Sequence, residues 1–117
     1  MKTELHIQII EDIIIDLVYS DKRMKQNLSD VIREKMQHHY TYLANIYSRT
    51  QGRTIQQFFI ETKIERSKLL MLSGMQIQDV AFKLHYSSNG HFSNQFKAIA
   101  GITPTQYKKQ NIKANGK

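Results

Sequence analysis

The chain has 117 residues, of which 40% are hydrophobic, enough for one domain with a modest core or for two small subdomains that share an element. It has no cysteine, which excludes disulfides and thiolate metal sites and suits a reducing compartment. The net charge of +7 is uneven, because residues 1–20 hold one base and four acids, whereas residues 21–117 hold sixteen bases and six acids. A basic body favours a polyanionic partner, although many basic surfaces are merely solvated.

The first predicted helix is amphipathic, with acids opposite an apolar stripe at i, i+3 and i+4 spacing. The stripe consists of Leu5, Ile9, Ile10, Ile13, Ile14, Leu17 and Val18. The longest apolar stretch, residues 7–19, is interrupted by charged residues and has no signal-peptide features, so it should not span or enter a membrane. The sequence therefore predicts a cytoplasmic protein with no membrane partner.

Two short helices are predicted next, from about residue 28 and over residues 40–49, with a polar break at residues 37–39 and Gly52 as the stop. Their inward faces are Leu28, Val31, Ile32 and Lys35 in the first helix and Leu43, Ile46 and Tyr47 in the second. Two short helices joined by a tight turn are the helix-turn-helix pattern.

A long helix is predicted over residues 54–72, which at about 1.5 Å per residue is about 28 Å long. Two further short helices follow at residues 77–84 and 88–98, and a last helix begins at Thr103 and Pro104. The inward residues of these two short helices are Ile77, Val80, Ala81, Leu84, Phe92, Gln95 and Phe96. Expected N-caps are Asn27 or Ser29, Thr54, Ser87 or Ser88, and Thr103.

The predicted fold is therefore all-α, with about seven helices and no strand pattern. Its parts are a first subdomain at residues 5–53, a linker helix at 54–72, a second subdomain at 73–110 and a polar, frayed tail at 111–117.

The chain also repeats itself after a shift of 49 residues, without a gap from residue 28 to residue 58. Identical pairs are Asp30 and Asp79, Val31 and Val80, Asn45 and Asn94, Gly52 and Gly101, Thr54 and Thr103, and Gln57 and Gln106. A repeat of this length indicates one supersecondary unit used twice.

The second repeat carries a specific set of spaced residues: Ile77, Asp79, Val80, Ala81, Tyr86, Ser87, Phe92, Ser93, Phe96, Lys97, Gly101, Ile102, Thr103, Pro104 and Tyr107. This pattern resembles the C-terminal signature of AraC/XylS-type transcription regulators. Residues 64–70 resemble the linker helix of that family and residues 42–47 its first recognition helix, so the likeness covers about residues 10–110. It implies two helix-turn-helix units that each place their second helix in a major groove, and a spacer of about 28 Å suits adjacent grooves about 34 Å apart.

The resemblance also implies the contact residues, carried over position by position. Base contacts are expected from Thr41, Ala44, Asn45, Ser48, Asn89, Gly90, Ser93 and Asn94. Phosphate contacts are expected from Lys35, Arg49, Arg53, Lys83, Ser87, Ser88, Lys97 and Lys108. Asparagine can pair with adenine through two hydrogen bonds. The alternative for both sets is that they are solvated surface residues.

Two departures from the family concern the turns and the recognition helices. The family usually has glycine in the turn, where this chain has Met36 and His85, and often arginine where it has Asn45 and Asn94. A left-handed backbone at either turn residue would carry a steric cost, which histidine tolerates better than most residues do.

The expected partner is double-stranded DNA. The family resemblance implies two further partners, RNA polymerase and a separate effector-binding or dimerisation domain that lies outside this sequence. No cofactor or metal is expected, because the adjacent side chains of His38 and His39 point about 100° apart and lack partners at ligand spacing. Nothing resembles a nucleophile–base pair, so an enzyme is not expected. The rival hypothesis is a helical module that docks a protein through its first helix, and RNA binding is a third option.

Overall fold

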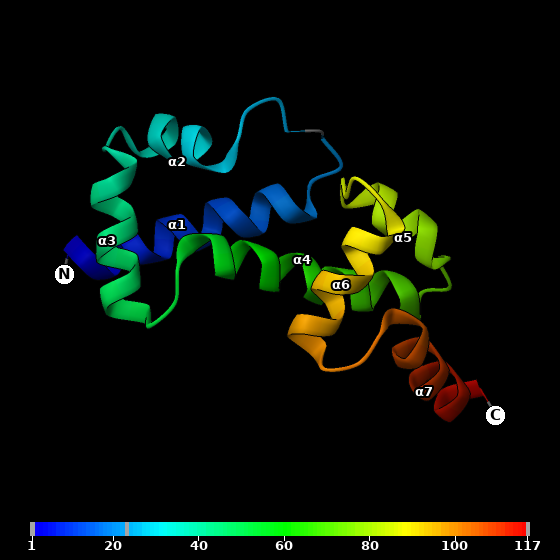
Figure 1. The fold of residues 1–117 in the computed structure, drawn as a ribbon. Helices are drawn as coiled ribbons and strands as arrows, with labels where there is room; N and C mark the ends of the chain where they lie inside the picture. The colour runs from blue at the N-terminus through cyan, green and yellow to red at the C-terminus, as the bar shows by residue number, and fades with distance from the viewer. Residues whose placement is uncertain (1, 23, 117) are drawn as a thin grey trace. The chain divides into compact units, whose positions relative to one another are not determined.

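The computed structural model describes residues 2–22 and 24–116, with side chains up to residue 111, and this part of the chain is all-α, as predicted (Figure 1). Its helices are α1 (Lys2–Tyr19), α2 (Leu28–Met36), α3 (Tyr40–Gln51), α4 (Ile55–Leu72), α5 (Ile77–Lys83), α6 (Asn89–Ala100) and α7 (Pro104–Gly116). They divide into two compact units, Met1–Phe59 and Ile60–Lys117, so that α4 contributes to both. None of the described helices combines the length and the apolar character needed to cross a bilayer.

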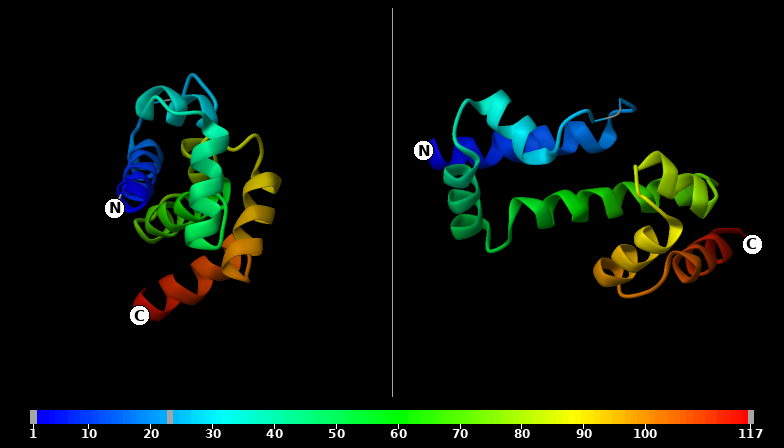
Figure 2. Two further views of the ribbon diagram at one scale, coloured as in Figure 1. Left: turned by 90° about the vertical axis from the view of Figure 1, so that its left-hand side faces the viewer. Right: turned by 45° about the horizontal axis from the view of Figure 1, so that its top comes forward.

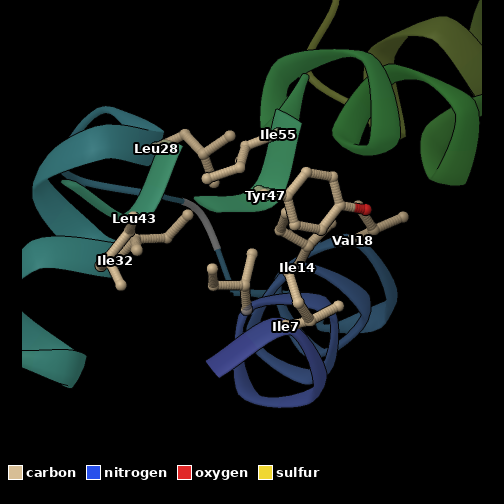
Figure 3. Close-up of a cluster of buried hydrophobic side chains, with 9 residues drawn as sticks. Ile7, Ile14, Val18, Leu28, Ile32, Leu43, Tyr47 and Ile55 are labelled. Carbon is tan, nitrogen blue, oxygen red and sulfur yellow. The ribbon is translucent and has the colours of Figure 1, made fainter. Parts of the chain in front are cut away.

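The first unit is built around a closed apolar core. Side chains from α1, α2 and α3 and the start of α4 converge in it (Figure 3). The buried members are Ile7, Ile10, Ile14, Val18, Leu28, Ile32, Leu43, Tyr47 and Ile55. After the turn, α3 runs across α2 rather than alongside it (Figure 2), which is the arrangement of a helix-turn-helix. The prediction that the first helix packs on the first repeat is confirmed.

Four residues of this unit differ from the predicted inward faces. Leu5 and Ile9 are exposed, at 59% and 36%, and the unpredicted Ile7 is buried instead. The isoleucine-rich run of α1 fits more than one helical stripe, and packing into the core shared with α2 and α3 selects the one through Ile7. Lys35 is also exposed, because Met36 supplies the apolar contact at the end of α2.

The second unit has its own core, which α4, α5 and α6 form together. Its buried members are Ile64, Met71, Val80, Ala81, Leu84, Tyr86, Phe92 and Phe96. Within α6, the rings of Phe92 and Phe96 lie 5.8 Å apart between centroids. The ring of Phe96 also meets that of Tyr107 at 5.6 Å, which fixes α6 against α7. Residues 111–116, predicted as a polar, frayed tail, continue α7 to Gly116; Lys117 lies outside the described residues.

Local signals set the helix ends as predicted. Asn27 caps α2, and Thr54 with Gln57 and Thr103 with Gln106 form reciprocal capping boxes at the starts of α4 and α7. The left-handed glycines Gly52 (φ 73°) and Gly101 (φ 85°) end α3 and α6.

The two turns are not identical, contrary to the ungapped repeat. His85 has the expected left-handed backbone, with φ 66°. In the first unit the left-handed residue is Gln37 (φ 56°), so the prediction of Met36 is wrong. The reason is that α2 extends to Met36, whereas α5 ends at Lys83, which is two positions earlier in the repeat. The left-handed residue of the first turn therefore lies one position later in the repeat than that of the second turn.

Candidate nucleic-acid interface

The second helix of each unit is anchored on one side and exposed on the other. Leu43 and Tyr47 fix α3, and Phe92 and Phe96 fix α6; all four side chains are 0% exposed. Because about 3.6 residues make a turn, this anchoring at i and i+4 turns the opposite face of each helix to solvent.

Most of the predicted base-contacting residues lie on these outward faces. Thr41 and Asn45 of α3 and Asn89, Gly90 and Asn94 of α6 are exposed. The remaining three, Ala44, Ser48 and Ser93, are only partly exposed. Ala44, next to the anchor residue Leu43, packs against the first core with its remaining surface exposed.

The predicted phosphate-contacting cations fall into two groups. Lys35, Arg49 and Lys97 are exposed. The other three cations, Arg53, Lys83 and Lys108, are partly buried. The guanidinium of Arg53 lies 5.1 Å from the centre of the Phe58 ring, and Lys108 donates a hydrogen bond of 3.2 Å to the carbonyl of Met75. These cations therefore also serve packing within their own units.

Both predicted serines are used at the start of α6. The hydroxyl oxygen of Ser88 accepts a hydrogen bond of 3.0 Å from the backbone N–H of His91, which confirms Ser88 as the N-cap. The hydroxyl of Ser87 lies 3.3 Å from Nδ1 of the same histidine. The start of the helix is thus held by both side chains.

A polar contact joins α1 to α3 beneath this outward face. The hydroxyl of Tyr47 donates a hydrogen bond of 2.7 Å to the carboxylate of Glu11, which also accepts one of 3.3 Å from Gln51. Burial, then the hydrogen bond and charge of Glu11, raise the pKa of Tyr47 to about 12, although the nearby Arg53 acts in the opposite direction. This contact ties the position of α3 to that of α1.

The second unit holds α6 with a different polar contact. The hydroxyl of Tyr86, in the turn before α6, donates a hydrogen bond of 2.7 Å to Gln95. Burial raises the pKa of Tyr86 to about 12, and burial lowers the pKa of Lys63, whose ammonium lies 4.0 Å from the centre of the Tyr86 ring. The predicted inward position of Gln95 is explained by this bond.

Sequence reasoning missed two aromatic residues beside the outward faces, Tyr42 and His91. Tyr42 is 49% exposed, and its ring lies 5.5 Å from that of His38 and 6.2 Å from that of His6. His91 is exposed and meets the Tyr86 ring edge to face at 5.2 Å. The shift of 49 residues places the two at the same position of the repeat, which is the signal that could have found them.

The same histidines do not assemble a metal centre. His6 and His38 lie 4.9 Å apart between ring centroids. Within the described residues, however, no group of three or more His, Cys, Asp or Glu side chains is placed to hold a metal ion. The chemistry available on α3 and α6 is therefore that of amides, hydroxyls and cations, which suits hydrogen bonding to a polyanion.

Comparison with known proteins identifies the arrangement. A helix-turn-helix domain model matches residues 33–110. YtdP of Bacillus subtilis (strain 168), an uncharacterized HTH-type transcriptional regulator, is 26% identical over 102 residues, which are 86% of this chain and 13% of YtdP. The HTH-type transcriptional activator AarP of Providencia stuartii is 27% identical over 108 residues, which are 91% of this chain and 78% of AarP.

A solved structure shares the fold across both units. The transcriptional regulator from Chromobacterium violaceum, described among AraC-type DNA-binding domain-containing proteins, superposes with a TM-score of 0.80 at 15% identity, covering 93% of this chain and 94% of that one. The chain spans most of AarP but only a small part of YtdP. Because the family model matches two thirds of its length, the chain belongs to the helix-turn-helix domain family.

Proposed function

We propose that this protein is a sequence-specific DNA-binding transcription regulator that inserts α3 and α6 into successive major grooves of double-stranded DNA. The observation that carries the proposal is the recurrence of asparagine at the same exposed position of both anchored helices, Asn45 and Asn94. The side-chain amide of asparagine can donate a hydrogen bond to N7 of adenine while its oxygen accepts one from the N6 amino group, so one residue type recurring here suits base reading. The basic balance of residues 21–117 supports a polyanionic partner.

The residues around each asparagine would divide the work. Thr41, Asn89 and Ser93 would assist base reading, and Gly90, without a side chain, would allow the backbone to approach the groove. Exposed cations on the same helices, Arg49 and Lys97, would contact phosphates and set affinity rather than sequence preference.

The wider assembly is part of the same proposal. A regulator of this type would act on RNA polymerase, and a separate effector-binding or dimerisation domain would supply control. This chain matches only 13% of YtdP, which is consistent with a DNA-binding module of this kind also occurring within longer proteins.

The test of DNA binding is its salt dependence. Binding to a fluorescent duplex should be measured by anisotropy from about 50 to 200 mM salt, where each phosphate contacted by a cation contributes about −0.9 to the log–log slope. Lys97→Ala and Arg49→Ala should weaken binding to all sequences. Each replacement should also reduce the steepness of the log–log slope by the contribution of about one phosphate contact. Selection of bound duplexes from a random pool would then give the operator.

A protein-interaction module is the second candidate, and one observation favours it. The outer face of α1 exposes Leu5, Ile9, Ile15 and Tyr19. Absent or salt-insensitive DNA binding at low salt would favour this candidate over the DNA-binding proposal.

A further inference from the structure

We infer that Tyr42 and His91 form an equivalent pair of backbone-phosphate donors, one in each unit, beside the base-reading asparagines. The inference rests on the proposed DNA-binding function and adds two residues that the family resemblance did not supply. It is carried by the way that each ring is held in place.

Each ring is fixed at one end by the residue four positions earlier in the chain. In the second unit, Nδ1 of His91 lies 3.3 Å from the hydroxyl of Ser87, and the ring stands edge to face on Tyr86, at 5.2 Å and 84°. In the first unit, the ring of Tyr42 lies 5.5 Å from that of His38. Ser87 and His38 are themselves 49 residues apart, so the repeat preserves the bracing although it changes the residue types.

Tyr42 has a second support from α1. The ring of His6 meets Tyr42 at 6.2 Å and 81°, and meets His38 at 4.9 Å. The rings of His6 and His38, from two other segments, therefore restrict the rotation of Tyr42 on the outward side of α3. A side chain that is ordered before binding loses less conformational entropy when it binds.

The far end of each ring carries a hydrogen-bond donor without a protein partner. Within the described part of the chain, no hydrogen bond involves the hydroxyl of Tyr42 or Nε2 of His91, and both side chains are exposed. When the Ser87 hydroxyl donates to Nδ1, the hydrogen of the neutral imidazole lies on Nε2, which is then left to donate to a ligand. The hydroxyl and the imidazole N–H can each donate to a phosphate oxygen.

The position on the helix favours a phosphate over a base. Both residues are the third of their helix, and side chains there lean back over the first turn, toward the chain that precedes the helix. Asn45 and Asn94, three residues later, occupy the middle of the outward face. A braced donor at the side of that face would reach the sugar–phosphate backbone that borders the groove.

The test compares Tyr42→Phe and His91→Phe with the wild-type protein, because phenylalanine keeps a ring but removes the donor. Anisotropy should be measured with the selected operator and with a random duplex of equal length. Each variant should lose about tenfold in affinity for both duplexes, the effect of one hydrogen bond to a charged group, with an unchanged ratio between them. Tyr19→Phe, on α1, is the matched control and should bind as the wild type does.

Methylphosphonate linkages supply a readout that does not depend on the folding of a variant. Replacing the contacted phosphate by a neutral methylphosphonate should weaken wild-type binding about tenfold, and should weaken Tyr42→Phe or His91→Phe no further at that linkage. Unchanged affinity of both variants, additive losses at every linkage, or an altered operator-to-random ratio would each overturn the inference. If the wild-type protein binds no duplex at all, the proposed DNA-binding function is refuted. If it binds but the variants behave as the wild type does, only the phosphate contacts of Tyr42 and His91 are refuted.

Discussion

Replacing Ile14 by alanine should destabilise the first unit by about 3–4 kcal/mol. Ile14 lies on α1 with 0% of its surface exposed, inside the core that α1, α2 and α3 share. Removal of three buried carbons costs about 2.4 kcal/mol in transfer free energy, at about 0.8 kcal/mol each. The cavity left between packed helices adds about 1 kcal/mol, within the range of about 2–5 kcal/mol for such substitutions.

The neighbouring Ile15 provides a matched control, since it has the same side chain on the same helix but is 43% exposed. Ile15→Ala should change stability by less than about 1 kcal/mol, because alanine also favours the helix. Urea denaturation followed by circular dichroism would give the free energies, and hydrogen exchange read separately over residues 1–59 and 60–117 would locate the loss. An Ile14→Ala variant no less stable than Ile15→Ala would refute this account of the core.

Other predictions concern base reading, pH and the turns. Asn45→Ala and Asn94→Ala should each relax base preference in a different element of the selected site, by about 1–3 kcal/mol; uniform weakening with an unchanged selected sequence would contradict this. Because the pKa of Tyr86 is raised from 10.0 to about 12, the stability from its neutral phenol should be present below pH 10 and lost as the pH rises through about 12. The free energy of unfolding, taken from denaturation curves at several pH values across that range, should decrease less with rising pH for Tyr86→Phe than for the wild type. His85→Gly and Gln37→Gly should each raise stability by about 1 kcal/mol, since glycine adopts their left-handed backbone without a Cβ clash; lower unfolding midpoints would show that their side chains matter more.

Much of the fold could be predicted because its signals are local. Capping residues such as Thr54 and Thr103, the stops at Gly52 and Gly101, and the 3.6-residue spacing of apolar positions act within one or two helical turns. The repeat and the spaced motif of residues 77–107 then indicated the family, and with it the outward faces of α3 and α6. The contact residues of these faces remain predictions until DNA binding is measured.

By itself, therefore, the sequence determined the all-α fold of the described residues, the two related units and the position of the paired asparagines. Tertiary packing alone decided which stripe of α1 is buried, because several isoleucine stripes satisfy the same periodicity and only packing into the shared core distinguishes Ile7 from Ile9. It also decided which cations remain fully exposed and which aromatic rings are braced, as with His6 and Tyr42. These outcomes depend on residues far apart in the chain, whose contacts form only when the helices pack, and no local pattern encodes them.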